Sequence, residues 1–93
     1  MFILMSVHHP RPGREAELID SMHRYGDAIR GKPGLRSIHT LKDRGSSRLV
    51  GLAIFESEAD FLALAPTARA AVERDPFDEW EEGEIDGLRL EEV

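Results

Sequence analysis

Cysteine is absent from the 93-residue chain, which excludes disulfides, thiolate catalysis and cysteine-based zinc or iron–sulfur sites. Asparagine and glutamine are absent as well. Heat-adapted proteins tend to lose these thermolabile residue types, so the absence fits a hot habitat or a GC-rich genome. No apolar run approaches the ~20 residues that a membrane-spanning helix needs. The sequence therefore indicates a soluble protein without a membrane partner.

A leader and a basic surface are also missing. The first residues, MFILMSV, have no basic region before them and no small-residue cleavage site after them, so we expect a cytoplasmic protein. The net charge is −6, whereas a nucleic-acid-binding protein normally presents a basic face. We therefore expect no nucleic-acid partner. The arginines scattered over the first half either form surface salt bridges or steer an anionic small molecule.

We expect one domain, residues 1–93, which buries roughly 60–65% of its unfolded surface. Association with another chain would therefore enlarge its hydrophobic core.

The first half of the chain predicts a strand and a helix. Phe2 to His8 is a short β-prone run that ends at a Pro/Gly turn. A helix is expected from Arg14 to Arg30, with apolar residues on one face at a 3.6-residue period. The sequence GKPG then stops it.

The middle of the chain predicts a β-hairpin. Leu35 to Leu41 and Arg48 to Glu56 are strand-like runs on either side of the turn KDRGSS. The second of these strands is apolar on both faces, which is typical of a strand that is covered on both sides. Helices of one chain would cover only one face, so a second copy of the sheet is expected on the other.

The last third predicts a second helix and a fourth strand. Ser57 has the character of a helix N-cap, and Pro66 is expected to kink the helix or to restart it. An acidic connector follows, with a helical turn around Phe77 to Glu82, and Leu88 to Val93 alternates as a strand. The order β-α-β-β-α-β predicts an α+β, ferredoxin-like antiparallel sheet with helices on one face.

Three short motifs carry a resemblance over essentially the whole chain. They are PRPGREAEL after the first strand, GKPG before the second, and FESEADF after the hairpin. Their order and spacing resemble the antibiotic biosynthesis monooxygenase family of the dimeric α+β barrel superfamily. The resemblance implies a homodimer whose two sheets pack face to face, which would account for the two-sided third strand.

The resemblance also implies two kinds of chemistry. Members of the family include cofactor-independent oxygenases of aromatic polyketides and quinols, and haem-degrading enzymes. The haem-degrading branch uses an Asn on the first strand and a Trp and a His on the second helix. Those positions fall on Ser6, Leu64 and Arg74 here, so we expect no haem degradation. The family's common Glu and Trp on the third strand are Ala53 and Phe55.

The histidines are the main candidates for chemistry. His8 and His9 are adjacent strand residues that point to opposite faces, so they cannot readily bind one metal ion together. His8 shares its face with Ser6, which the resemblance turns toward a pocket, and His9 would face the dimer side or solvent. His39 would lie about 10 Å from His8 at Cα, and the two would bracket a small ligand if both faced the helices.

Two functions remain open. The first is a cofactor-independent, monooxygenase-like enzyme acting on a small aromatic or quinone-type molecule, in which His8 or His39 abstracts a proton and Arg74 holds a developing oxyanion. The pocket would be lined by Ser6, Phe61 and Leu64. The second is a non-catalytic small-molecule-binding or stress-response protein of the same dimeric fold. Neither needs a cofactor, and no histidine or carboxylate spacing indicates a metal site.

Overall fold

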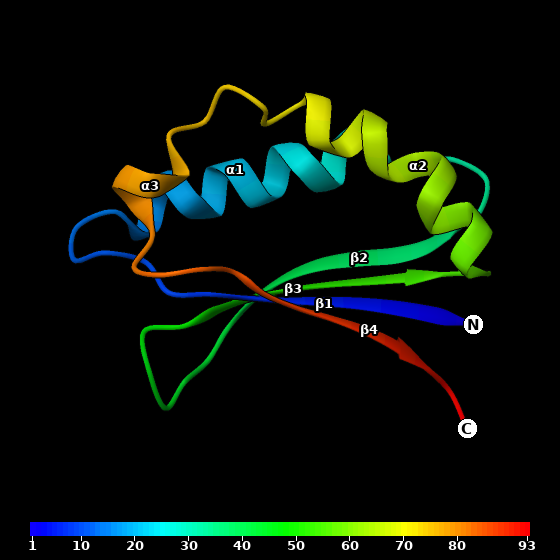
Figure 1. Ribbon diagram of the computed structural model, residues 1–93, viewed down its shortest axis with the longest axis horizontal. Helices are drawn as coiled ribbons and strands as arrows, with labels where there is room; N and C mark the ends of the chain where they lie inside the picture. Colours follow the sequence, from blue (N-terminus) through cyan, green and yellow to red (C-terminus); the bar gives the residue numbers. More distant parts are fainter.

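The computed structural model describes the whole chain, Met1 to Val93. The elements are β1 (Phe2–His8), α1 (Glu15–Asp27), β2 (Leu35–Lys42), β3 (Leu49–Phe55), α2 (Glu58–Ala70), α3 (Phe77–Trp80) and β4 (Asp86–Glu91). The strands form one antiparallel sheet in the order β2-β3-β1-β4. All the helices lie on one face of this sheet (Figure 1). The ferredoxin-like α+β fold predicted from the sequence is thereby confirmed.

The bounds of some elements differ from the prediction. β1 has the expected bounds, but α1 ends at Asp27 rather than at Arg30. A turn takes up the difference and leads to Gly31, whose φ of 81° is a left-handed conformation that suits glycine. β4 begins and ends two residues earlier than expected, because its pairing with β1 runs from Asp86 to Glu91.

α2 is a single helix that contains Pro66 in its interior. The expected restart at Pro66 therefore does not occur, although a proline there leaves one carbonyl of the preceding turn without its helical partner. The expected N-cap is present, since the Ser57 hydroxyl accepts a hydrogen bond from the Asp60 amide at 3.2 Å. This cap satisfies one of the free amides at the helix start.

The hydrophobic core lies between the sheet and the helices, toward the chain termini. Its aromatic centre is formed by three phenylalanines, with ring centroids of Phe2 and Phe61 5.3 Å apart and those of Phe55 and Phe61 5.5 Å apart. Ile29, Ile38 and small residues of α2 complete the same cluster. No helix of the chain is both long and apolar enough to cross a membrane.

The other face of the sheet carries a second apolar surface, the open face. Strand alternation and the pairing register place nine apolar side chains there: Ile3, Met5, Val7, Leu41, Val50, Leu52, Ile54, Leu88 and Leu90. Leu88 and Leu90 are 46% and 37% exposed. All of β4 is exposed, because no helix of the chain covers this edge of the sheet. The two-sided character predicted for β3 is therefore present in the structure.

Candidate functional site

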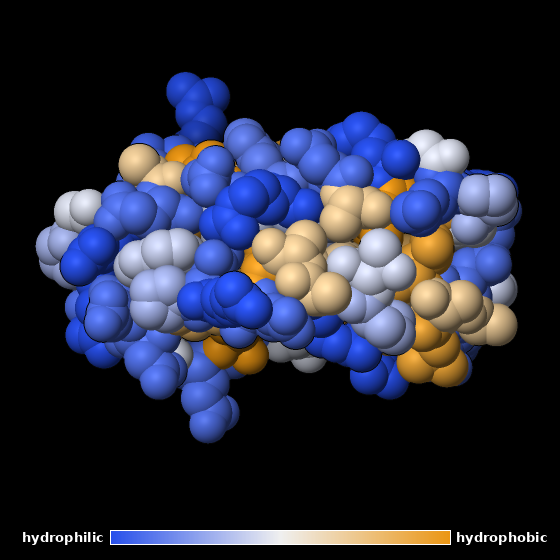
Figure 2. All heavy atoms as spheres, turned by 90° about the horizontal axis from the view of Figure 1, so that it is seen from above, coloured by the Kyte–Doolittle hydropathy of each residue, from blue (hydrophilic) through white to orange (hydrophobic).

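A cavity of about 310 Å³ lies between the helices and the sheet. Its wall is mostly hydrophobic and is formed by residues of the sheet, of the helices α1, α2 and α3 and of their connectors. Figure 2 shows hydrophobic residues between the hydrophilic surfaces of the helices. The apolar lining includes Leu4, Met22, Ile38, Ala53, Val72 and Phe77. Seven residues with polar side chains interrupt this lining: Ser6, His8, Ser21, Tyr25, His39, Thr40 and Arg69.

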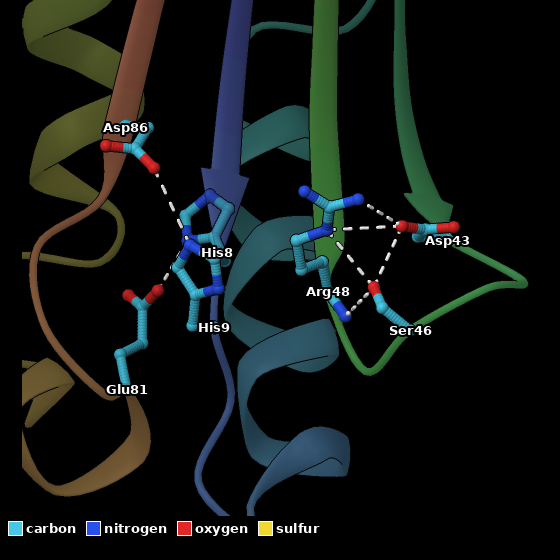
Figure 3. A network of polar contacts seen from close by, with 7 residues as sticks. All are labelled: His8, His9, Asp43, Ser46, Arg48, Glu81 and Asp86. Atoms are coloured by element: carbon cyan, nitrogen blue, oxygen red, sulfur yellow. Dashed lines mark hydrogen bonds and ion pairs between the residues drawn. The ribbon is translucent and has the colours of Figure 1, made fainter.

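His8 is the centre of a buried polar line. Its Nδ1 lies 2.9 Å from Oε1 of Glu81, and its Nε2 lies 3.0 Å from the Ser6 hydroxyl. His8 is 7% exposed and Glu81 is 4% exposed, so both groups are shielded from water. Figure 3 shows the Glu81 carboxylate reaching His8 from the chain that precedes β4.

The backbone brings Glu81 to this position. The Arg11 amide donates to the Trp80 carbonyl and the Glu82 amide donates to the His9 carbonyl, both at 2.7 Å. Pro10 and Glu81 form an antiparallel bridge between these two bonds. These backbone contacts join the α3 segment to the chain that leaves β1. They place Glu81 beside His8, where its side chain enters the site.

Ser6 occupies a gap left by glycine. Its register partner on β3 is Gly51, and a Cβ at Gly51 would lie only 2.6 Å from the Ser6 hydroxyl oxygen. Any larger residue at this position would force the hydroxyl away from His8. The same missing side chain opens the floor of the cavity next to Ser6, since Gly51 is one of its lining residues.

This arrangement suits proton abstraction. With a proton on Nδ1 directed at Glu81, Nε2 of His8 accepts the Ser6 hydroxyl proton, and the lone pairs of the Ser6 oxygen remain available to a ligand in the cavity. A buried carboxylate next to the imidazole stabilises the doubly protonated ring that a general base becomes. The second oxygen of Glu81, Oε2, is buried and has no hydrogen-bond partner.

A second polar cluster fastens α1 to the connector after α2. The Ser21 hydroxyl donates to Asp75 at 2.6 Å, and Arg24 donates to the same carboxylate oxygen at 2.8 Å. Burial alone would raise the pKa of Asp75, but these two hydrogen bonds outweigh it and hold the pKa below its ordinary value. The cluster keeps the roof of the cavity in place above the sheet.

The structure separates the two histidines that were expected to bracket a ligand. His39 is in register with Leu52 and its side chain points to the open face, although its backbone position borders the cavity. The neighbouring Ile38 faces the helices and belongs to the core. His8 and His39 therefore lie on opposite sides of the sheet and cannot act on one ligand in the cavity. His9 is 3.6 Å from Asp86 at the outer edge (Figure 3).

Three other expected site residues lie away from the cavity. Arg74 is exposed beyond the end of α2 and is not part of the lining. Phe61 belongs to the aromatic core, and Leu64 packs against that core. Of the expected pocket residues, only Ser6 lines the cavity. The cation that α2 contributes is instead Arg69.

Sequence reasoning missed Glu81, Gly51 and Arg69. Glu81 is one of several acidic residues in EWEEGEID, and nothing in that run distinguishes it from its neighbours. A glycine in a strand signals close approach of another group, and this was the one signal for Gly51 in the sequence. The structure contains no group of three or more histidine, aspartate or glutamate side chains that could hold a metal ion.

No model of a known protein family matches the sequence, and no curated protein matches it. Solved structures do match. A protein described as an antibiotic biosynthesis monooxygenase has a TM-score of 0.79 at 10% identity, with coverage of 100% of this chain and 99% of that one. A candidate antibiotic biosynthesis monooxygenase from Deinococcus radiodurans has a TM-score of 0.81 at 14% identity, with coverage of 100% and 93%.

A mutant of MhuD with two manganese protoporphyrin IX molecules bound per active site has a TM-score of 0.78 at 22% identity, covering 100% of this chain and 95% of that one. At these identities the likeness shows the fold alone. The resemblance in fold to proteins named antibiotic biosynthesis monooxygenase, expected from the sequence motifs, is confirmed over nearly the whole chain.

Proposed function

We propose that this protein is a cofactor-independent, monooxygenase-like enzyme that deprotonates a small phenol- or quinol-type molecule in the cavity. The observation that carries the proposal is the line Ser6–His8–Glu81, with contacts of 3.0 and 2.9 Å, on the wall of an apolar cavity. The shared fold with structures named antibiotic biosynthesis monooxygenase is consistent with this chemistry, but fold alone does not determine function.

The proposed reaction uses dioxygen as the oxidant. The phenolic hydroxyl gives its proton to the Ser6 oxygen as Ser6 gives its own to Nε2 of His8, and the resulting phenolate donates electrons from its para carbon to dioxygen. A carbon–oxygen bond forms at that carbon. The oxygen–oxygen bond then breaks, one atom stays as the quinone carbonyl, and the other leaves as water with the two hydrogens that the ring has lost.

The surroundings of His8 favour this step. A phenolate is stabilised by donors that are already oriented in a site with little water, and the Ser6 hydroxyl is held in place by His8. The apolar wall formed by residues such as Leu4 and Ala53 suits an aromatic ring. Glu81 then stabilises the imidazolium until the proton is returned.

A non-catalytic binding protein is the second candidate. It is supported by the apolar residues Ala53 and Phe55, which stand where the resemblance leads us to expect a Glu and a Trp. In that case the cavity would hold a small aromatic molecule, and the Ser6 oxygen, bonded to His8, would only accept a hydrogen bond from it. Both candidates bind a small aromatic molecule, but only the enzyme would convert it.

Oxygen uptake with phenols and naphthols separates the two candidates. We expect the wild-type protein to consume dioxygen and His8→Ala to lose at least ~100-fold of that rate, the usual scale of a general base. His23→Ala is the matched control, because His23 is exposed on α1 and should leave the rate unchanged. Binding without oxygen uptake in the wild type would favour the second candidate.

We also propose that the protein is a homodimer that covers the open face. That face presents Val50, Leu52 and Ile54 next to the exposed leucines of β4. A contiguous apolar sheet surface of this kind is a liability unless another surface covers it. A two-fold copy supplies a surface of the same width and twist, and no other part of the chain reaches this face.

A further inference from the structure

Arg69 is the only lysine or arginine that lines the cavity. It lies in the last turn of α2 and is itself exposed, which places its guanidinium at the opening rather than in the interior. No ion pair involves Arg69, whereas Arg24 pairs with Asp20 and Asp75. In a protein with a net charge of −6, an arginine at the mouth of an apolar cavity without a carboxylate partner is an available anion-binding group.

Tyr25 lies on the same part of the wall. Its pKa is raised because the side chain is largely buried, and the charge of Arg69, which lines the same cavity, partly opposes this rise. Tyr25 also lines the cavity and packs against the aromatic core. An O–H donor next to the core and a guanidinium at the opening therefore border the same cavity.

His8 and Ser6 lie on the opposite side of the cavity. They occupy the end of β1 that adjoins α3, where Glu81 enters, whereas the core begins at the other end of β1 with Phe2. Figure 1 shows α3 at one end of the layer of helices and the chain termini at the other. A ligand that fills the cavity thus meets the proton-accepting line at one end and Arg69 with Tyr25 toward the other.

We propose that the ligand is a hydroxyaryl carboxylate, whose hydroxyl faces Ser6 and whose carboxylate is bound by Arg69 and the Tyr25 hydroxyl. The hydroxyl end of this assignment rests on the proposed function, while the carboxylate end rests on Arg69 and Tyr25 alone. An arginine fork binds a carboxylate through two parallel N–H donors. The apolar wall between the two ends accommodates the ring.

The test compares hydroxynaphthoate with naphthol, which lacks the carboxylate, by calorimetric titration of the wild-type protein. We expect hydroxynaphthoate to bind ~10- to 100-fold more tightly, the scale of one hydrogen-bonded charge contact. Arg69→Gln should remove this preference and leave the affinity for naphthol unchanged. Arg44→Gln is the matched control, because Arg44 is exposed in the hairpin turn and should keep the preference.

The outcomes distinguish this inference from the proposed function. An equal preference for hydroxynaphthoate in Arg69→Gln and the wild type would overturn the inference, and so would its loss in Arg44→Gln. Failure of hydroxynaphthoate to bind would overturn it as well. Binding with the expected preference but without oxygen uptake would support the carboxylate site and contradict the proposed oxygenase function. Oxygen uptake with naphthol, together with equal affinities for naphthol and hydroxynaphthoate, would support the oxygenase function and contradict the carboxylate site.

Discussion

Ser6 and Gly51 should be energetically coupled, because both determine whether Nε2 of His8 has a hydrogen-bond partner. Ser6→Ala removes the hydroxyl that lies 3.0 Å from Nε2. It leaves a polar atom of a residue that is only 7% exposed without a partner. We expect the free energy of unfolding to fall by about 1–3 kcal/mol, the cost of an unsatisfied buried group.

Gly51→Ala should produce the same loss by another route. The new Cβ would lie 2.6 Å from the Ser6 oxygen, so the hydroxyl must rotate away from His8. The cost of about 1–3 kcal/mol is partly offset by about 0.5–1 kcal/mol, because alanine is more stable than glycine in a strand. In the double variant there is no hydroxyl to displace, and the loss at Nε2 occurs only once.

The double variant should therefore be more stable than the sum of the single variants predicts, by about 1–3 kcal/mol. Urea unfolding at one fixed protein concentration measures this, with the single tryptophan, Trp80, as the fluorescent reporter. Gly87 provides the control cycle. It is the register partner of Ser6 on β4, and a Cβ there would meet nothing within 4 Å. We expect Ser6 and Gly87 to be additive.

Additivity of Ser6 and Gly51 within about 0.5 kcal/mol would refute the reasoning, because it would mean that the hydroxyl does not depend on the space at Gly51. Equal coupling in the Gly87 cycle would refute it as well, since the effect would then belong to the strand rather than to the contact. Either result would also weaken the proposed role of Ser6 as the group that passes a proton to His8.

Three further predictions concern other parts of the molecule. Leu52→Glu should yield a monomer in size-exclusion chromatography, or insoluble protein. The control Leu62→Glu, at an exposed position of α2, should remain a soluble dimer. A stable Leu52→Glu dimer would contradict the proposed interface. Bonds from the Gly45 amide and neighbouring side chains lower the pKa of Asp43 from 3.8 to about 2, so its stabilising effect is present above pH 3.8 and is lost as the pH falls through about 2. The stability difference between the wild type and Asp43→Asn should shrink over that window in unfolding experiments, and a constant difference would show that the charge is irrelevant. Ser21→Ala should lower the free energy of unfolding by about 1.5–3 kcal/mol through its lost bond to a carboxylate, and a Ser21→Ala protein as stable as the wild type in urea would show that this bond does not fasten α1.

Local signals were sufficient to predict most of the fold. The bounds of β1, the stop after α1 and the hairpin follow from residue types that act over a few positions. The two-sided β3 follows from a simple alternation, and it led correctly to the apolar open face. β2 was harder, because a register shift between Leu35 and Ser37 lets both Leu35 and Ile38 face the core. Strict alternation fails across that irregularity, and this is why the direction of His39 could not be predicted.

The site was predicted less completely, because its parts come from distant segments. His8 and Ser6 share one strand, and their common face is evident from parity. Glu81 reaches His8 through backbone pairing between the chain after β1 and the α3 segment, and no local pattern encodes that pairing. Arg69 lies in the last turn of α2 and Arg74 follows the end of this helix, so the point at which α2 ends and the packing of its last turn decide which of the two lines the cavity.

The contact between His8 and Glu81 spans 73 residues, nearly the whole polypeptide. A nascent chain that has not yet reached Glu81 has β1 without its β4 partner and an imidazole without its carboxylate. Contacts of such sequence separation form late, since the entropy of closing the loop must first be overcome. His8 can therefore meet its carboxylate only after the segment from α3 to β4 has been made, and removal of residues 81–93 should abolish the proposed chemistry even where α1 and α2 fold.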